Sequence, residues 1–446
     1  MKTEKYTKAV ATNMVIANMV GTGIFTAIGY QVMNNGIPDP FSILIIWVIG
    51  GLLSLCGAFS YSEVASCVNR SGGEYSYLSD LYHPLVGFLS GWTSIIVGFS
   101  AAIAALGLAI GEYFLPLIGF DKDYTFNVLV FDISIQKLVA LGAIIIIAGI
   151  HMRGIKFGGI FQNYITFFKL ILISLILVLP FLFSDYEHSN IRFLPTAETS
   201  KTILSSAFAG SLVWVMFSYS GWNASTYILK NLENPKKTLP FSLIFGTIFV
   251  TIIYVLLNFI FMYVASFKEL EGQIDVGNIV MQKVLGKNTA LIISGVFSFA
   301  LLSGISAMMM AGPRVAEEIG KDFDLFKLLA KQNRKGNPTS AIIFIASVSS
   351  LLVVFSSFKD MIEYIGIALT IFSFLTVSAV FIIRKKNIKN QLGVRCWGYP
   401  FTPLLFQFLS LWMMYYFISE DPIKIVWCIL TLMPAVLIYY ISKSRK

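Results

Sequence analysis

Small and polar residues interrupt two of the long apolar segments of this chain. The first interruption is ANMVGTGIF (residues 17–25) and the second is MFSYSGWN (residues 216–223). Backbone groups cannot be left unpaired in lipid, so an interrupted helix is tolerated only where it lines a cavity or is buried in protein. Two such segments, at the start of two similar halves, are typical of the binding site of a secondary transporter. The pattern predicts binding of a small zwitterion.

The first interruption offers a place for a carboxylate. A break at Gly21-Thr22-Gly23 leaves an outer half-helix that begins near Ile24, and its first amides have no intrahelical partner. We expect an α-carboxylate to be held there by the amides of Thr22, Gly23 and Ile24 and by the Thr22 hydroxyl. The flanking glycines allow the close backbone approach that this requires. A helix-packing patch is the alternative for Gly-x-Gly alone, and the matching second break favours the binding site.

The second interruption offers acceptors for an ammonium group, namely the carbonyls of Phe217, Ser218 and Ser220. Phe217 is placed to cover a substrate as an aromatic gate, and Trp222 or Asn223 to line a side-chain pocket. The chain contains 38 phenylalanines, most of which must pack against lipid or other helices. Only the position beside the break distinguishes Phe217 and Trp222.

Lys169 is a charged residue deep within an apolar segment, in FFKLI (residues 167–171). A lysine at mid-helix in the membrane costs at least ~2.5–3.5 kcal/mol and is a candidate for function. It lies about a dozen positions into its segment, some ~18 Å from the start at ~1.5 Å per residue, so snorkelling to the interface would be strained. Its ammonium could lie beside the first break in the place of a metal ion, or it could bind a proton.

The composition is that of a membrane protein. Of 446 residues, 56% are hydrophobic and 13% charged, and the mean hydropathy is +0.76, whereas a soluble domain carries about a quarter of charged residues. The net charge of +9 comes mostly from alternate loops, which argues against nucleic acid as a partner. The short basic start leads directly into an apolar segment, so we expect no cleavable signal. Four cysteines lack metal or disulfide spacing, and we expect no metal or cofactor.

Apolar runs of about 20 residues predict twelve transmembrane helices in one domain, residues 1–446, of an all-α membrane protein. Because most of the lysines and arginines lie on one set of loops, both termini are predicted to be cytoplasmic. The first five spans (about 9–184) and the next five (203–384) start alike, and an odd number per unit predicts an inverted repeat. The twelve ranges are 9–35, 41–67, 85–114, 134–151, 157–184, 203–230, 239–265, 288–312, 339–356, 361–384 and the extra helices 399–418 and 422–441.

The positions of the acidic residues restrict the classes of substrate that we expect. The first, third, sixth and eighth spans contain no Asp or Glu at mid-span. Glu63 and Glu74 are expected near the cytoplasmic end, and Glu112 and Glu363 near the external end. A site for arginine, lysine or a polyamine would be expected to offer a carboxylate to the distal charge, so the pattern favours a neutral zwitterion.

Four stretches resemble the amino acid–polyamine–organocation (APC) superfamily, and most closely its L-type and related bacterial amino acid permeases. Together they span most of the chain in the order and spacing of that family. They are GTGIF at 21–25, YSE at 61–63 with SGGEY at 71–75, FSYSGWN at 217–223 with NP at 234–235 and LP at 239–240, and GPRV at 312–315.

The resemblance implies a five-plus-five inverted-repeat fold with two extra helices, and amino acid transport by alternating access. Residues 162–169 are similar to the family's helix 5 segment, whose lysine is thought to replace a sodium site. Lys169 then implies sodium-independent exchange or proton-linked uptake. The family's helix 8 contributes small polar residues near the substrate, which here would be Ser303 and Ser306.

Eukaryotic L-type members bind a heavy chain through a cysteine in an external loop. The corresponding loop of this chain comprises about residues 114–133. This loop contains no cysteine, so no disulfide-linked partner is expected, and a prokaryotic inner (cytoplasmic) membrane is favoured.

The leading interpretation is a sodium-independent transporter of neutral L-amino acids, either an exchanger or a proton symporter. An antiporter for cationic amino acids or polyamines is the alternative, and a sensor or channel is less favoured. His83, His151 and His188 are interpreted as ordinary residues near loops, and no enzyme is expected.

Overall fold

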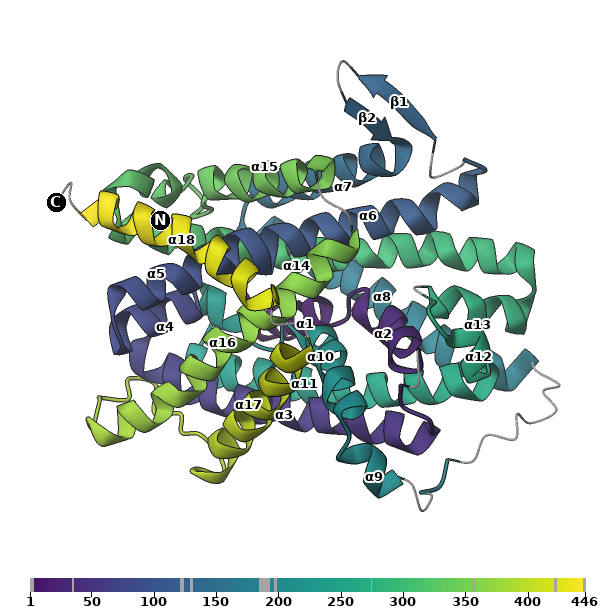
Figure 1. Cartoon of the computed structure of the whole chain (residues 1–446). Helices are drawn as coiled ribbons and strands as arrows, with labels where there is room; N and C mark the ends of the chain where they lie inside the picture. The colour runs from purple at the N-terminus through teal and green to yellow at the C-terminus, as the bar shows by residue number, and fades with distance from the viewer. Residues whose placement is uncertain are drawn as a thin grey trace.

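The computed structural model describes residues 4–33, 36–120, 124–128, 131–183, 193–195, 199–273, 275–355, 358–420 and 423–443. Long helices such as α3, α6 and α14 run in roughly the same direction across the molecule, while α1, α2 and α10 meet near its centre (Figure 1). The first part of the chain forms α1 (Lys8–Met19), α2 (Gly23–Gln31), α3 (Pro40–Val68), α4 (Glu74–Leu81), α5 (Pro84–Thr93), the π-helix η1 (Ser94–Ala101), α6 (Ala102–Phe114), the 3₁₀ helix η2 (Leu115–Ile118), α7 (Ile135–Met152) and α8 (Ile155–Phe183).

The second part begins with α9 (Thr199–Ile203) and contains the second interruption, which separates α10 from η3. Its elements after α9 are α10 (Ser206–Tyr219), the 3₁₀ helix η3 (Ala224–Asn231), α11 (Pro235–Val264), α12 (Phe267–Leu270), α13 (Val276–Leu285), α14 (Lys287–Asp322), the 3₁₀ helix η4 (Asp324–Ala330), α15 (Thr339–Phe355), α16 (Phe358–Lys385), α17 (Phe401–Glu420) and α18 (Ile423–Lys443).

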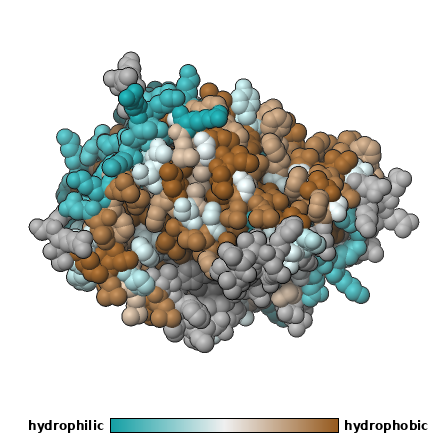
Figure 2. Space-filling model, turned by 90° about the horizontal axis from the view of Figure 1, so that it is seen from above, coloured by the Kyte–Doolittle hydropathy of each residue, from teal (hydrophilic) through white to brown (hydrophobic). Residues whose placement is uncertain are grey.

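Helices occupy all twelve ranges that the sequence predicted, although residues 34–35, 184, 356 and 422 at their ends lie outside the described residues. Seven helical segments of the described chain are long and apolar enough to cross a membrane. Hydrophobic residues cover the middle of the face in Figure 2, and hydrophilic residues gather toward two opposite ends, as expected of a multi-span membrane protein. Twelve crossings, the inverted repeat and the orientation stay predictions.

A short β-hairpin corrects the expectation of a purely α-helical protein. Strand β1 (Thr125–Val128) pairs antiparallel with β2 (Phe131–Ser134) between η2 and α7. β-Branched and aromatic residues occupy five of the eight strand positions, and such residues favour extended backbone where no helix period competes. The hairpin lies in the loop that was predicted to be external.

Glycines allow the central helices to approach closely. Helix α1 packs against α8, α11 and α14, and α3 packs against α11. A Cβ atom on Gly51 of α3 would lie 2.3 Å from Thr251 Cγ2 of α11, and one on Gly57 would lie 2.6 Å from the Trp222 ring. Small residues at helix contacts are the usual way in which membrane helices pack tightly.

We predict that Gly51→Val lowers the free energy of unfolding by about 1–3 kcal/mol, because the new side chain must displace Thr251. Thermal unfolding in detergent measures the effect as a lower Tm. Gly142→Val is the matched control, since a Cβ atom on Gly142 of α7 meets nothing within 4 Å. Equal Tm values for the two variants would show that α3 and α11 are not packed as described.

Candidate functional site

The two helix interruptions touch each other. Helix α1 ends at Met19 and α2 begins at Gly23, while α10 ends at Tyr219. A Cβ atom on Gly23 would lie 2.6 Å from Ser218 Oγ, and one on Gly221 would lie 2.9 Å from Asn18 Cγ. Gly221 also has a φ of +98°, a conformation that L-residues with side chains rarely adopt. Each break therefore depends on a glycine that lets the other break come close.

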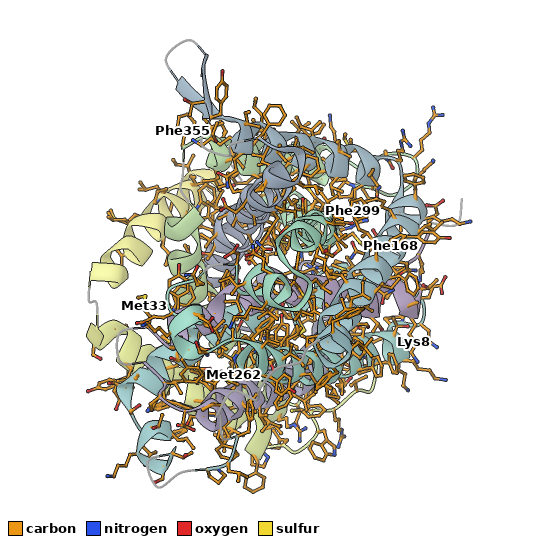
Figure 3. All side chains as sticks on the ribbon, turned by 90° about the vertical axis from the view of Figure 1, so that its right-hand side faces the viewer. Lys8, Met33, Phe168, Met262, Phe299 and Phe355 are labelled. Atoms are coloured by element: carbon orange, nitrogen blue, oxygen red, sulfur yellow. The ribbon has the colours of Figure 1, made fainter. Side chains whose placement is uncertain are left out.

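Lys169 of α8 binds the end of the first broken helix. Its ammonium donates to the Ala17 carbonyl at 3.3 Å and to the Val20 carbonyl, and the side chain is 2% exposed. The neighbouring Phe168 points outward and contacts Phe299 at the surface of the bundle (Figure 3). The last carbonyls of a helix have no intrahelical partner and form the negative end of its dipole. Lys169 thus places a positive charge at the end of α1. Its role in the place of a metal ion and its role as a proton-binding group both stay predictions.

Tyr254 of α11 joins both breaks, and sequence reasoning did not select it. Its hydroxyl lies 2.5 Å from the Met19 carbonyl and 2.8 Å from the Ser218 carbonyl, so a single proton is shared between the ends of α1 and α10. The ring packs against Trp47 and Tyr219, with centroid distances of 5.3 and 5.0 Å. A buried tyrosine hydroxyl normally finds an acceptor, which is the signal that could have identified it.

A cavity of about 120 Å³ lies beside the two breaks. Since about 10–15 Å³ of such volume holds one water molecule, the cavity accommodates on the order of ten non-hydrogen atoms. Its wall combines the breaks with parts of η1, α6, α16 and α17. Most of the residues predicted for the site line it, namely Gly21, Thr22, Gly23, Phe217, Ser218, Ser220, Trp222 and Asn223.

Three of the predicted residues lie outside this lining. Ile24 is fully buried in the hydrophobic core. The Ser303 hydroxyl donates to the Ala300 carbonyl at 2.7 Å, and the Ser306 hydroxyl lies 2.9 Å from His151 Nε2. Helix α14 instead contributes Met308 to the cavity.

His151, interpreted from the sequence as an ordinary residue near a loop, is only 3% exposed at the end of α7. Its pairing with Ser306 brings together residues 155 positions apart, which the sequence does not reveal. His83 lies at the N-cap of α5, as expected for a loop residue, and His188 lies outside the described residues.

The acceptors predicted at the second break are partly used within the protein. The Phe217 carbonyl accepts from the Ser220 amide at 3.0 Å, and the Ser218 carbonyl accepts from Tyr254. Trp222 is 4% exposed and packs edge-to-face against Tyr61, with a centroid distance of 4.7 Å. The Ser220 carbonyl has no donor among the described residues, which makes it the acceptor best placed for a ligand.

Glu74 of α4 also lines the cavity, so the prediction that no carboxylate lies near the pocket is wrong. Its Oε1 accepts hydrogen bonds from the Tyr61 hydroxyl, from Ser373 Oγ at 2.9 Å and from Asn223 Nδ2 at 3.2 Å. Burial raises the pKa of this carboxyl, while the three hydrogen bonds lower it. The loop before α4 contacts η3, where the Gly72 amide donates to the Tyr227 carbonyl at 3.0 Å. Position along the chain did not indicate this tertiary contact.

No group of three or more His, Cys, Asp or Glu side chains is arranged to hold a metal ion in the described part of the chain.

Comparison with known proteins relates the whole chain to transporters. A family model described as "Amino acid permease" matches residues 10–442. The serine/threonine exchanger SteT of Bacillus subtilis (strain 168) is 26% identical over 441 residues, which cover 98% of this chain and 96% of SteT. The human b(0,+)-type amino acid transporter 1 is 24% identical, covering 97% of this chain and 87% of that protein. The human cystine/glutamate transporter is 25% identical, covering 94% and 81%.

We predict that Tyr254→Phe slows amino acid uptake about tenfold, because the loss of the shared hydroxyl costs about 1–3 kcal/mol and loosens both breaks. Uptake into proteoliposomes at equal protein content measures this. Tyr82→Phe is the control, since the Tyr82 hydroxyl donates to the Leu375 carbonyl away from the breaks. Equal uptake by both variants would remove Tyr254 from the mechanism.

We predict that Lys169→Met lowers uptake roughly 10–100-fold, since a hydrogen bond from a charged group contributes about 1.5–3 kcal/mol. The protein should still reach the membrane folded, which size-exclusion chromatography in detergent tests. Lys137→Met is the matched control, because the Lys137 ammonium also donates to a helix carbonyl, that of Val354 at 2.7 Å. Wild-type kinetics for Lys169→Met would contradict a role for this charge.

Proposed function

Since the chain belongs to the amino acid permease family, we propose that it is a sodium-independent secondary transporter of neutral L-amino acids that works by alternating access. The observation that supports this most directly is the contact between the two breaks beside a cavity of amino acid size. The relatives are named as transporters or exchangers of amino acids, which favours transport over an enzymatic role.

The α-carboxylate of the substrate binds at the start of α2. The N-cap residue Thr22 makes no side-chain cap with this helix, and the amides of Thr22 and Gly23 have no acceptor among the described residues. They present the positive end of the helix dipole to the cavity. The α-ammonium group binds the Ser220 carbonyl, and Phe217 covers the ligand. Ile24, Ser303 and Ser306 do not line the cavity and are not assigned to the substrate.

Sodium independence rests on Lys169. Its ammonium lies on the Ala17 and Val20 carbonyls, which are the kind of unwound backbone oxygens that coordinate a sodium ion in transporters with broken helices. A fixed positive charge there fulfils the role of the ion, because it neutralises the same helix end.

The proposal includes twelve transmembrane helices, a five-plus-five inverted repeat and cytoplasmic termini in a prokaryotic inner membrane, without a disulfide-linked heavy chain. Rocking of the broken helices and their neighbours against the rest of the bundle would open the cavity to each side in turn. The leading substrates are small neutral amino acids, in agreement with the cavity size and with the substrates in the name of SteT.

An antiporter for cationic amino acids or polyamines is the second candidate. Glu74 favours it, because this carboxyl lies in the wall of the cavity. Competition separates the two candidates: inhibition of labelled serine or alanine uptake by lysine or putrescine would support the cationic substrates.

We predict uptake of a labelled mixture of neutral amino acids into proteoliposomes in sodium-free buffer. Empty vesicles, vesicles preloaded with unlabelled amino acids and vesicles under an inward proton gradient distinguish exchange from proton symport. Gly23→Val is the inactive control, because its side chain would enter the space of Ser218. Absence of uptake under every condition would contradict the proposed function, and binding retained by Gly23→Val would place the carboxylate elsewhere.

A further inference from the structure

Glu74 is a buried carboxyl that lies where four elements of the bundle meet. It begins α4, and its hydrogen-bond donors come from α3 (Tyr61), from the second break (Asn223) and from α16 (Ser373). All three donate to Oε1. The other oxygen, Oε2, is buried without any hydrogen-bond donor among the described residues, although Glu74 as a whole is only 1% exposed and lines the cavity.

In the described part of the chain, this carboxyl has no counter-cation. Among the described residues, none of the recorded ion pairs of Lys, Arg or His involves Glu74. The titratable groups that interact with it are three phenols, Tyr61 of α3, Tyr77 of α4 and Tyr227 of η3. From α16 the facing group is the Ser373 hydroxyl, and η1, α6 and α17 add only uncharged residues to the cavity wall.

Lys169 does not fill this role, because it is separate from the cavity. Its ammonium already donates to two carbonyls, and the residue does not belong to the lining. Of Lys169 and Glu74, Glu74 is therefore the one whose side chain lines the cavity.

The physical consequence is a carboxyl whose protonated and ionised states are favoured by opposing interactions. Without a counter-cation, a buried carboxylate carries a desolvation penalty, so the closed cavity favours the protonated acid. The three donors to Oε1 stabilise the carboxylate, and water that enters an open cavity reduces the penalty. Opening to one side or the other therefore allows a proton to bind Oε2 or to leave it.

Resting on the proposed function, we propose that Glu74 is the proton-binding residue of this transporter and couples amino acid uptake to the entry of one proton per cycle. With the cavity open to the outside, the carboxylate accepts a proton on Oε2 and becomes a carboxylic acid. With the cavity open to the cytoplasm, the acid releases that proton to water and becomes the carboxylate again. Lys169 is not assigned this role, because its ammonium donates to the Ala17 and Val20 carbonyls.

The test compares wild type and Glu74→Gln in proteoliposomes with the membrane potential clamped. An inward gradient of about two pH units can drive up to about 100-fold accumulation through one proton per cycle. We expect at least about tenfold stimulation for wild type. Glutamine can receive the hydrogen bonds on its amide oxygen but cannot release a proton. We therefore expect no stimulation for Glu74→Gln, and exchange at equal pH that no longer depends on pH.

Glu112→Gln is the control variant, because Glu112 of α6 accepts from Gln136 at 3.2 Å and lies outside this cavity wall. It should keep the full response to the gradient. Stimulation retained by Glu74→Gln would overturn the proposal, as would a wild type that exchanges amino acids but ignores the gradient. In both cases the proposed function stands, whereas it fails if wild type shows no sodium-free uptake of any kind.

Tyr61→Phe provides a second test if Glu74→Gln is inactive in exchange. Removal of this donor from Oε1 destabilises the carboxylate, so the midpoint of the pH dependence of uptake should move to higher pH. An unchanged midpoint would overturn the proposal. A purely structural role for Tyr61 would lower the rate at every pH without moving the midpoint.

Discussion

The pairing of backbone groups inside the membrane is the constraint on which the rest of this structure depends. Two broken helices expose carbonyls and amides in the buried interior of the bundle, and in a membrane-spanning protein lipid offers such groups no partners. The carbonyl ends receive fixed donors: Lys169 serves α1, Tyr254 is shared between α1 and α10, and the Ser220 amide bonds to Phe217. The glycines that let the breaks touch, the packing of α8 and α11 around them and the cavity itself all follow from this requirement.

The proposed binding site consists of the polar groups that have no hydrogen-bond partner within the described protein. Among the described residues, the first amides of α2 have no acceptor. Oε2 of Glu74 likewise has no hydrogen-bond donor there. The cavity wall thus contains one group that attracts an anion and one that attracts a cation. In the proposed binding mode, the helix start takes the substrate carboxylate and the Ser220 carbonyl takes its α-ammonium group. Glu74 then takes a proton or the distal ammonium of a cationic side chain.

The two helix breaks could be predicted from local sequence, because glycine and serine within an apolar run weaken a helix in any tertiary context. Lys169 could be selected as a candidate residue because a charge in the middle of an apolar segment is evident without knowledge of the fold. It missed Tyr254, whose hydroxyl meets Met19 across 235 positions, and it missed the pair of Ser306 and His151. Those contacts depend on the tertiary packing of the helices, which local sequence does not reveal. The β-hairpin was missed because strands of four residues leave little periodicity to read.

The presence of Glu74 in the cavity wall, which sequence reasoning did not predict, has the largest consequence for the choice of substrate. With Glu74 ionised, the wall of the cavity lacks one positive charge, and a proton or the distal ammonium of a cationic side chain can supply it. A neutral amino acid together with a proton then presents the same net charge as a cationic amino acid alone. The neutral and cationic interpretations are therefore two ways of satisfying one buried carboxyl, and the hydrogen bonds to Oε1 decide which is favoured, because they set how readily Glu74 gives up its proton.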